Sequence, residues 1–413
     1  MESLTHEKKL QSIIETEKML AEIQDVDVLL ERLLTEARRI VRADAGSIYV
    51  LEGKNIKIRY AQNDTQLRKL RPGDKLPYVS FSFPITEKSI VGYCVLTGKV
   101  INISDCYNLP ENAPYAFNKT TDAKTGYRTK SMLTLPLKMP NGRILGVLQI
   151  INAQDEDGNP TGFNSDDELY IMHFAANATQ ALKHAYLTSN MIKRMQRMAA
   201  YRDPKETYPH VERVSSFAVE IYDRWAAEHK VPGMEQQNFR DNLKIAAKCH
   251  DFGKVGVSDV ILKKVSPRFT EDERAIMKGH TCIGAMLFNE PESPLDEMAR
   301  DVCLWHHEWW DGSAGYPGHL DFQNYVIGEP VPDAEPLKGE EIPLSARIVA
   351  LADVFDALSH RRVYKEAWST EAAFIEIEGL SGRQFDPGIV AAFMQVKDRI
   401  CAINAAWENV VED

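Results

Sequence analysis

The sequence predicts a multidomain protein in which an α+β domain with an antiparallel sheet precedes an all-α domain. Three observations support this prediction. Residues 25–153 show one helical pattern followed by strand patterns, and a long helical pattern from about 166 to 200 follows them. The rest of the chain is mostly helical in pattern and holds eight of the eleven histidines. At 413 residues the chain exceeds what one hydrophobic core supports.

The first half begins with apolar residues at helical spacing between 25 and 41, including Leu29, Leu33 and Ala37. Four strand patterns follow, at 45–51, 55–61, 131–138 and 143–153, with apolar residues alternating along the third. The last two flank Pro140-Asn141-Gly142, and an Asn-Gly between apolar runs is a strong hairpin signal. We therefore expect a helix followed by a mostly antiparallel sheet.

The long helical pattern runs from about Asp166 to Ala200 and ends before Pro204. A weak heptad seam of small and polar members follows it: Ala178, Leu182, Ala185, Ser189, Ile192, Gln196 and Ala199. Such a seam suits a dimeric signalling helix, so we predict a parallel homodimer through this helix. The alternative is a single amphipathic helix packed on its own domain.

Composition is that of an ordinary globular protein, with 44% hydrophobic and 26% charged residues. The formal net charge of -11 argues against binding to a nucleic-acid polymer or to an anionic membrane. No apolar run approaches the length of a membrane span, and the start, MESLTHEKKL, lacks a signal-peptide core. The six cysteines are scattered, which fits reduced thiols. We therefore expect a cytoplasmic protein.

The segment AAKCHDFGKVGV places His250, Asp251 and Lys254 together at the end of a helical pattern. Neutral imidazole and carboxylate are usual ligands of iron, manganese and zinc. On these residues alone, a capped helix end with a solvated lysine is an equally good interpretation. The rest of the chain decides between the two, because further candidate ligands form an ordered series with this pair: His210, His280, His306, His307 and Asp353.

This series resembles the HD superfamily of metal-dependent phosphohydrolases, specifically the HD-GYP branch, over about residues 200–395. The matching segments are His250-Asp251-x-Gly253-Lys254, His280, His306-His307-Glu308, Gly315-Tyr316-Pro317 and IPLSARIVALADVFDALSHRRVYK. Upstream, ADAGSIYV, AQND and ILGVLQIINA resemble a GAF domain over about residues 20–185. The implied domains are a GAF sensory domain with an N-terminal helix at 1–185, a connecting signalling helix at 186–202 and an HD-GYP domain at 203–413.

The resemblance implies two or three transition metal ions, with iron favoured and manganese or zinc as alternatives. His210, His250, Asp251 and Asp353 would hold one metal, and His280, His306 and His307 a second. Asp251 has two carboxylate oxygens and can bridge both ions. Glu206 lies four residues before His210, and the resemblance implies that it binds a third metal. The alternative is that Glu206 is a solvated acid at a helix start.

The activity that the resemblance implies is hydrolysis of cyclic di-GMP to pGpG or GMP, regulated by the GAF domain through an unknown ligand. Water activated by the metals would attack phosphorus in line, with Asp251 and Lys254 as catalytic residues. Lys254 would neutralise charge on the phosphoryl oxygens or protonate the leaving oxygen. Substrate contacts are expected from six residues: Gly315, Tyr316, Pro317, Asp356, Arg362 and Lys365. For Arg362 and Lys365 the alternative is an exposed basic helix face.

Two features depart from the family pattern. One extra residue separates Asp311-Gly312 from Gly315-Tyr316-Pro317, and a long insert follows Pro317. Long irregular loops are often lids or binding loops, so this insert could narrow substrate choice or lower turnover. Three rival functions stay open: a catalytically weak cyclic-dinucleotide receptor, an HD phosphohydrolase of another nucleotide, and a protein whose main activity lies in the GAF half.

Overall fold

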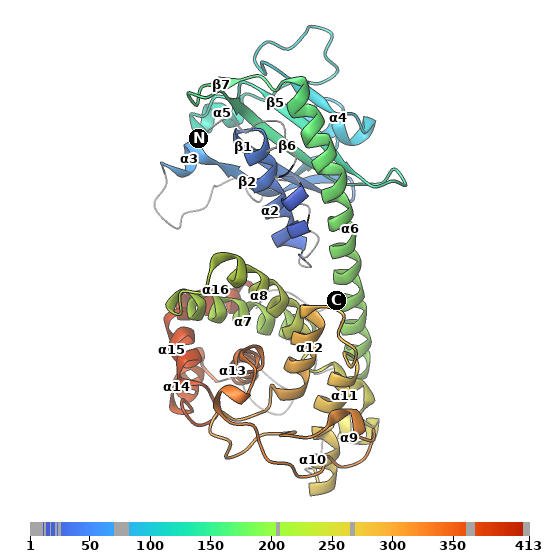
Figure 1. Ribbon diagram of the computed structural model, residues 1–413, viewed down its shortest axis with the longest axis vertical. Coiled ribbons are helices and arrows are strands. Elements are labelled where there is room, and N and C mark those ends of the chain that lie inside the picture. Colours follow the sequence, from blue (N-terminus) through green and yellow to red (C-terminus); the bar gives the residue numbers. More distant parts are fainter. Residues whose placement is uncertain are drawn as a thin grey trace. The chain divides into compact units, whose positions relative to one another are not determined.

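A computed structural model describes residues 26–69, 82–203, 207–264, 269–360 and 368–407, with a few positions between 11 and 23. The chain forms two compact units, Met1–Ser189 and Asn190–Asp413. An antiparallel sheet with helices makes up the first unit, and the second unit is helical (Figure 1). The predicted fold class is therefore confirmed.

The sheet of the first unit has the strand order β3-β2-β1-β6-β5-β4, with β7 paired to β6. All of its strand pairs are antiparallel. The predicted hairpin is confirmed, because β5 and β6 pair around Pro140–Gly142, where Gly142 has a φ of 85°. The strands are β1 (Ala43–Glu52), β2 (Asn55–Asn63), β3 (Ser82–Pro84), β4 (Ile101–Ile103), β5 (Met132–Lys138), β6 (Ile144–Gln154) and β7 (Pro160–Thr161).

Helices cover both faces of this sheet (Figure 1). Leu133, Leu135 and Leu137 of β5 share a core with α2 (Val26–Ile40) and the first half of α6 (Ser165–Arg202). Met132 and Val147, which point to the other face, share a second core with α4 (Ile90–Thr97). The period of two along β5 thus separates two cores. The short helices α3 (Asp64–Leu67) and α5 (Thr120–Thr125) complete the unit.

The long predicted helix is confirmed as α6, but its predicted dimer seam is wrong. Ala178, Leu182 and Ala185 are buried in the same core as the sheet and α2. Side chains that are fully buried within one chain cannot also contact a second copy. The alternative interpretation, a helix packed on its own domain, therefore holds for this part of α6.

The second unit consists of α-helices and short 3-10 helices, and in its largest core α7, α8, α12, α13, α14 and α15 pack together. No helix in the described part of the chain is both long and apolar enough to cross a membrane. The helices are α7 (Tyr208–Glu228), α8 (Gly233–Ala246), η1 (Ala247–Cys249), η2 (Phe252–Gly256), α9 (Asp259–Leu262), α10 (Glu271–Lys278), α11 (His280–Met286), α12 (Pro294–Trp305), η3 (Phe322–Asn324), η4 (Gly339–Glu341), α13 (Leu344–Ser359), α14 (Thr370–Gly379), α15 (Pro387–Gln395) and α16 (Lys397–Trp407).

Candidate metal centre

Seven of the predicted metal ligands come together in the second unit as two groups. Within each group the ligand atoms lie within 4.8 Å of one another. The first group is Asp251, His280, His306 and His307, and the second is His210, His250 and Asp353. They come from the start of α7, the η1–η2 junction, the start of α11, the end of α12 and the middle of α13.

His250 and Asp251 lie where the backbone changes from α-helix to the narrower 3-10 helix. Helix α8 passes into the 3-10 helix η1, and η2 begins right after Asp251. Gly253 then allows η2 to approach α11, since a Cβ atom there would lie only 1.8 Å from the carbonyl oxygen of His280. Only glycine permits this approach, which places the two elements side by side.

Backbone carbonyls fix the orientation of three of the histidines. A carbonyl oxygen can only accept a hydrogen bond, so the Nδ1 atoms must donate, and each Nε2 atom keeps its lone pair for a ligand. The bonds are His250 Nδ1 to the Ala247 oxygen (2.8 Å), His280 Nδ1 to the Met277 oxygen (2.7 Å) and His306 Nδ1 to the Val302 oxygen (2.9 Å).

Asp251 lies between the two groups. Its Oδ1 atom is 3.2 Å from His280 Nε2 and 3.9 Å from His306 Nε2. Its Oδ2 atom is 3.4 Å from His250 Nε2 and 2.5 Å from Lys254 Nζ. One oxygen therefore faces the first group and the other faces the second, as a bridging carboxylate requires.

The charges in this cluster favour metal-ligand forms. Burial opposes ionisation of Asp251, but the Lys254 ammonium and the neighbouring histidines outweigh it and hold the pKa of that carboxyl well below its usual range. Burial lowers the pKa of His306 to about 4 and that of His307 well below its usual value. The imidazoles of His306 and His307 are thus neutral at neutral pH, and Asp251 is a carboxylate.

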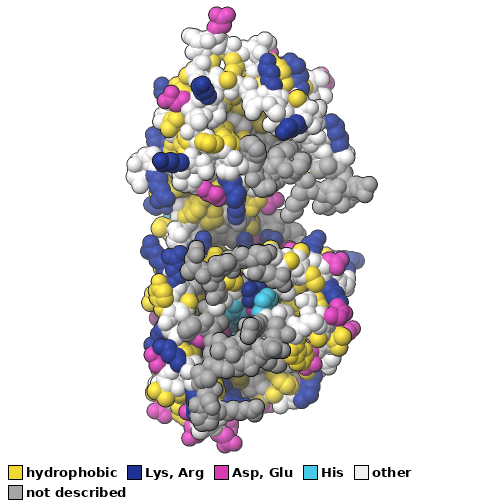
Figure 2. All heavy atoms as spheres, turned by 180° about the vertical axis from the view of Figure 1, so that it is seen from behind, with side chains coloured by type: hydrophobic (Ala, Val, Ile, Leu, Met, Phe, Trp, Pro, Cys, Tyr) yellow, Lys and Arg dark blue, Asp and Glu magenta, His cyan; other side chains and the backbone are white. Residues whose placement is uncertain are grey.

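Metal ions fit these residues. Asp251 Oδ1, His280 Nε2 and His306 Nε2 are buried and make no hydrogen bond to any described residue. Buried polar atoms rarely stay without partners, and a cation would satisfy all three. Mixed imidazole and carboxylate donors suit iron, manganese and zinc. His307 and Asp353 are the half-buried members of the two groups, and Figure 2 shows histidine side chains beside basic ones in a hollow of the helical unit.

Residues 207–358 match the HD domain, and residues 25–182 match the GAF domain. The chain consists of a GAF domain followed by an HD domain.

Curated relatives match about half of the chain. A cyclic di-GMP phosphodiesterase of Thermotoga maritima is 38% identical over 203 residues, which cover 49% of this chain and 48% of that protein. A cyclic di-GMP phosphodiesterase of Vibrio cholerae is 34% identical over 259 residues, covering 59% and 48%. A 3'3'-cGAMP-specific phosphodiesterase of the same species is 35% identical over 202 residues, covering 49% and 34%. The chain thus spans half or less of the length of these relatives.

The Gly-Tyr-Pro segment of the HD domain lies against the first ligand group. The Tyr316 ring is 4.7 Å from that of His307, and burial raises the pKa of Tyr316, so its hydroxyl stays protonated. Gly315 has a φ of 111°, a backbone conformation that favours glycine. The Tyr316–Pro317 peptide bond is cis. Glu308, to which the sequence analysis assigned no role, is buried beneath this turn and accepts a 2.6 Å hydrogen bond from the Gly318 N–H.

The insert after Pro317 packs on the helix that carries His280. Tyr325 is buried, its hydroxyl donates to the Glu329 carbonyl, and a Cβ atom on Gly279 would lie 2.0 Å from that hydroxyl. The Val331 N–H donates to the Ala275 carbonyl. The described insert is therefore anchored to α10 and α11, and Val326 and Ile327 are the exposed apolar residues of its tip.

Asp356, for which a contact with guanine is predicted, has partners within the protein. Its carboxylate is buried, accepts two hydrogen bonds from Arg213 (2.6 and 2.9 Å) and lies 2.7 Å from His210 Nδ1. Burial opposes its ionisation, but His210, His360 and Arg213 outweigh this and lower its pKa. Asp356 therefore orients the ligand candidate His210. Arg213 was not predicted, although it lies one turn after His210 on α7.

Asp356→Asn should reduce metal binding without weakening substrate binding. We expect metal affinity to fall about 10–100-fold, because an outer partner of a ligand is lost. Breaking the buried pair with Arg213 should cost roughly 3 kcal/mol of unfolding free energy. Elemental analysis, thermal denaturation and KM measure the three effects. Asp386→Asn is the matched control, a buried aspartate paired with Arg347 at 2.6 Å. A raised KM with unchanged metal content would instead support the predicted contact between Asp356 and guanine.

Three predicted site residues, Glu206, Arg362 and Lys365, lie outside the described residues. Lys254 is described, and its ammonium contacts Asp251.

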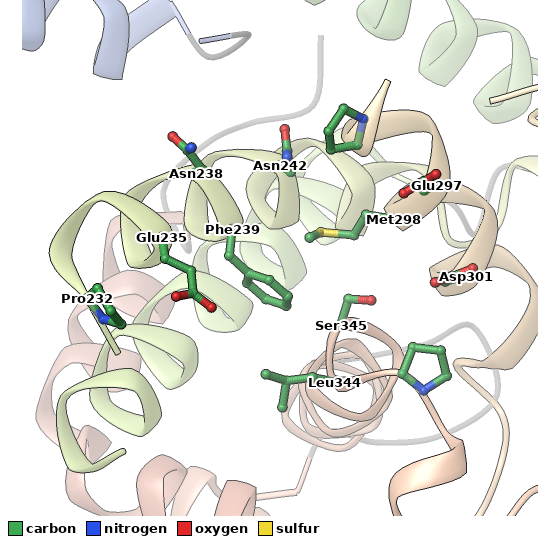
Figure 3. A pocket seen from close by; sticks show the side chains of 12 residues that line it. Pro232, Glu235, Asn238, Phe239, Asn242, Glu297, Met298, Asp301, Leu344 and Ser345 are labelled. Atoms are coloured by element: carbon green, nitrogen blue, oxygen red, sulfur yellow. The ribbon is translucent and has the colours of Figure 1, made fainter. Parts of the chain in front are cut away.

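A groove of about 690 Å³ between α8, α12 and the start of α13 shares no residue with the ligand groups (Figure 3). Its charged lining residues are all acidic: Glu235, Glu297 and Asp301. Carboxylates repel a phosphodiester, so this groove does not suit the phosphate-containing substrate of a phosphodiesterase.

Proposed function

We propose that this chain is a metal-dependent phosphodiesterase of the HD-GYP branch that hydrolyses cyclic di-GMP and is regulated by its GAF domain. The observation that carries the proposal is the bridging place of Asp251 between two groups of ligand candidates, with Lys254 beside it. The names of the relatives supply the substrate class. A receptor without activity is disfavoured, because every described ligand position keeps its ligand side chain.

The ligands that we propose are His210, His250, Asp251 and Asp353 at one ion, and His280, His306 and His307 at a second. Glu206 would hold a third, and iron is the ion that we propose. Bound metals would polarise the phosphoryl oxygen and activate water for in-line attack.

The protein's own groups supply the remaining steps. Asp356 holds the His210 ring, and Glu308 holds the turn that presents the Tyr316 hydroxyl as a donor. The Lys254 ammonium stabilises negative charge on the phosphoryl oxygens or delivers the proton to the leaving oxygen. Arg362 and Lys365 would bind the guanine or the second phosphate.

A second substrate, 3'3'-cGAMP, is favoured by the name of one relative. The purified chain should be tested on both dinucleotides after elemental analysis. We expect two or three transition metal ions per chain and a kcat/KM for cyclic di-GMP at least about tenfold higher than for 3'3'-cGAMP, a difference of one or two polar contacts. The reverse ratio would reassign the substrate, and metal-loaded protein without hydrolysis of either would favour a receptor.

The proposed boundaries are 1–185 for the GAF domain, 186–202 for the connecting helix and 203–413 for the HD-GYP domain. A reducing, cytoplasmic location is part of the same proposal. It is supported by the six cysteines, all of which are free.

We also propose a homodimer, now through the opposite side of α6. Six large apolar side chains on this helix are exposed by 45–82%: Leu169, Met172, Leu187, Met191, Met198 and Tyr201. At ~100° per residue they lie within an arc of about 100° on the helix surface. With roughly 100 Å² exposed on each side chain, two copies would bury on the order of 1,200 Å², the lower bound for a specific interface. A second copy is the occupant that we propose, and this area supports it.

Replacing Leu187 and Met191 together by glutamate should convert the dimer to a monomer. Each substitution places a carboxylate in an apolar contact, and we expect dimer affinity to fall at least about 100-fold. Sedimentation equilibrium measures the effect. Lys193→Glu places the same group on an exposed position off this stripe and should leave the dimer intact. A monomeric wild-type chain at tens of micromolar, or equal behaviour of both variants, would refute the interface.

A further inference from the structure

The end of α6 is fixed to the HD domain close to the candidate metal centre. Within the second unit, Ile192 and Met195 pack against the helical core, and Ala199 and Asp203 are buried. The Asp203 N–H still donates to the Ala199 carbonyl at 2.9 Å, so Asp203 continues the last turn of the helix. The helix that leaves the sheet unit therefore ends on residues that face the site.

The last two residues of this turn hold the segment that carries Lys254. Arg202 Nη2 donates to the Val257 carbonyl (2.8 Å) and to Asp259 Oδ1 (2.8 Å). Asp203 Oδ2 lies 3.7 Å from Lys254 Nζ. The Val257 N–H in turn donates to the Lys254 carbonyl at 3.1 Å. Both the backbone and the side chain of this segment are therefore tied to the end of α6.

Among the described residues, the carboxylates of Asp251 and Asp203 both lie near the Lys254 ammonium. Asp251 contacts it at 2.5 Å and belongs to the ligand cluster, whereas Asp203 lies outside both ligand groups. Asp203 is only 3% exposed, so its charge is little screened by solvent. Among the described residues, Asp203 is a carboxylate that can hold the ammonium in place while Asp251 serves the metal site.

A small cavity lies between the same helix and Asp251. Gln196 is 6% exposed, and neither polar atom of its amide has a hydrogen-bond partner among the described residues. It borders a cavity of about 50 Å³ that Tyr208, Lys248 and Asp251 also line. This volume is large enough for a water molecule, so the helix end is incompletely packed beside the ligand groups.

We propose that Asp203 is a positioning residue for Lys254, through which the end of the connecting helix sets the place of the ammonium at the reaction centre. The catalytic consequence rests on the proposed phosphodiesterase function, whereas the contact between the two side chains does not.

The full chain with Asp203→Asn tests this proposal in two independent ways. Acylation of Lys254 by a lysine reagent, quantified by mass spectrometry without substrate, should rise about threefold or more, because the paired carboxylate is lost. The kcat for cyclic di-GMP should fall about tenfold while KM and metal content stay unchanged, as for a group needed only in the transition state. Asp203→Glu keeps the charge and should recover most of both effects.

Asp259→Asn is the matched control, because Asp259 also pairs with Arg202 but is exposed and makes no contact with Lys254 among the described ion pairs. It should match wild type in both measurements. Equal acylation of Lys254 in Asp203→Asn and wild type, or equal changes in Asp203→Asn and Asp259→Asn, would overturn the proposal. So would a loss of metal content that Asp203→Glu does not reverse. If the wild type hydrolyses no dinucleotide but Lys254 acylation changes as expected, the positioning role stands and the proposed function fails.

Discussion

Asp251→Asn should lower the rate of cyclic di-GMP hydrolysis about a thousandfold or more, because the substitution removes the charge of a residue that faces both ligand groups. Its Oδ1 atom lies near His280, and its Oδ2 atom lies near His250. An amide offers one neutral oxygen and one NH₂ group, and an NH₂ group cannot bind a cation. The bound metal should therefore drop from two or three ions to one or none per chain, as measured by elemental analysis.

Asp241→Asn is the control for this substitution, since Asp241 is an equally buried aspartate on α8 outside both ligand groups. It should retain wild-type metal content and rate. If Asp251→Asn kept its metals and lost only the rate, Asp251 would be a catalytic acid or base instead of a ligand. Retention of both would remove it from the site.

The ligand cluster could be predicted from the sequence because its chemistry lies in the residue types and their order. His250-Asp251, His280 and His306-His307 are recognisable without any knowledge of packing, and the structure brings all three segments together. The roles of the outer partners could not be predicted in this way. Asp356 lies 143 residues from Arg213, and only the crossing of α7 and α13 shows that these two side chains pair.

The sequence also could not predict which face of α6 packs against the core. Both sides of this helix are apolar, with Ala178, Leu182 and Ala185 on one and Leu187 and Met191 on the other. Helical periodicity identifies two stripes but not the partner of each. The heptad spacing favoured the stripe with small residues, which in the structure fits closely against the sheet unit's own core. The contacts with α2 and β5 determine which face of α6 is buried, and these two elements come from distant parts of the chain.

Lys254→Ala should separate chemistry from binding in this site. The ammonium lies beside the bridging carboxylate, where negative charge on the phosphoryl group would develop. Removing a charge that is already positioned to stabilise the transition state lowers kcat about 100–1,000-fold, while ground-state binding changes little. We therefore expect kcat to fall by that factor, KM to stay within about threefold and the metal content to remain unchanged.

The last expectation follows from the charges around Asp251. Without the ammonium, this carboxylate loses its closest positive neighbour, but a metal ion neutralises the same charge at shorter range and is bound more tightly when no cation competes with it. Lys264→Ala is the matched control, because Lys264 is buried to a similar degree and pairs with Glu273 outside the ligand groups. It should change neither kcat nor KM. A fall in metal content parallel to the fall in kcat would show that Lys254 supports the ligand cluster, and a raised KM with unchanged kcat would make it a substrate-binding residue.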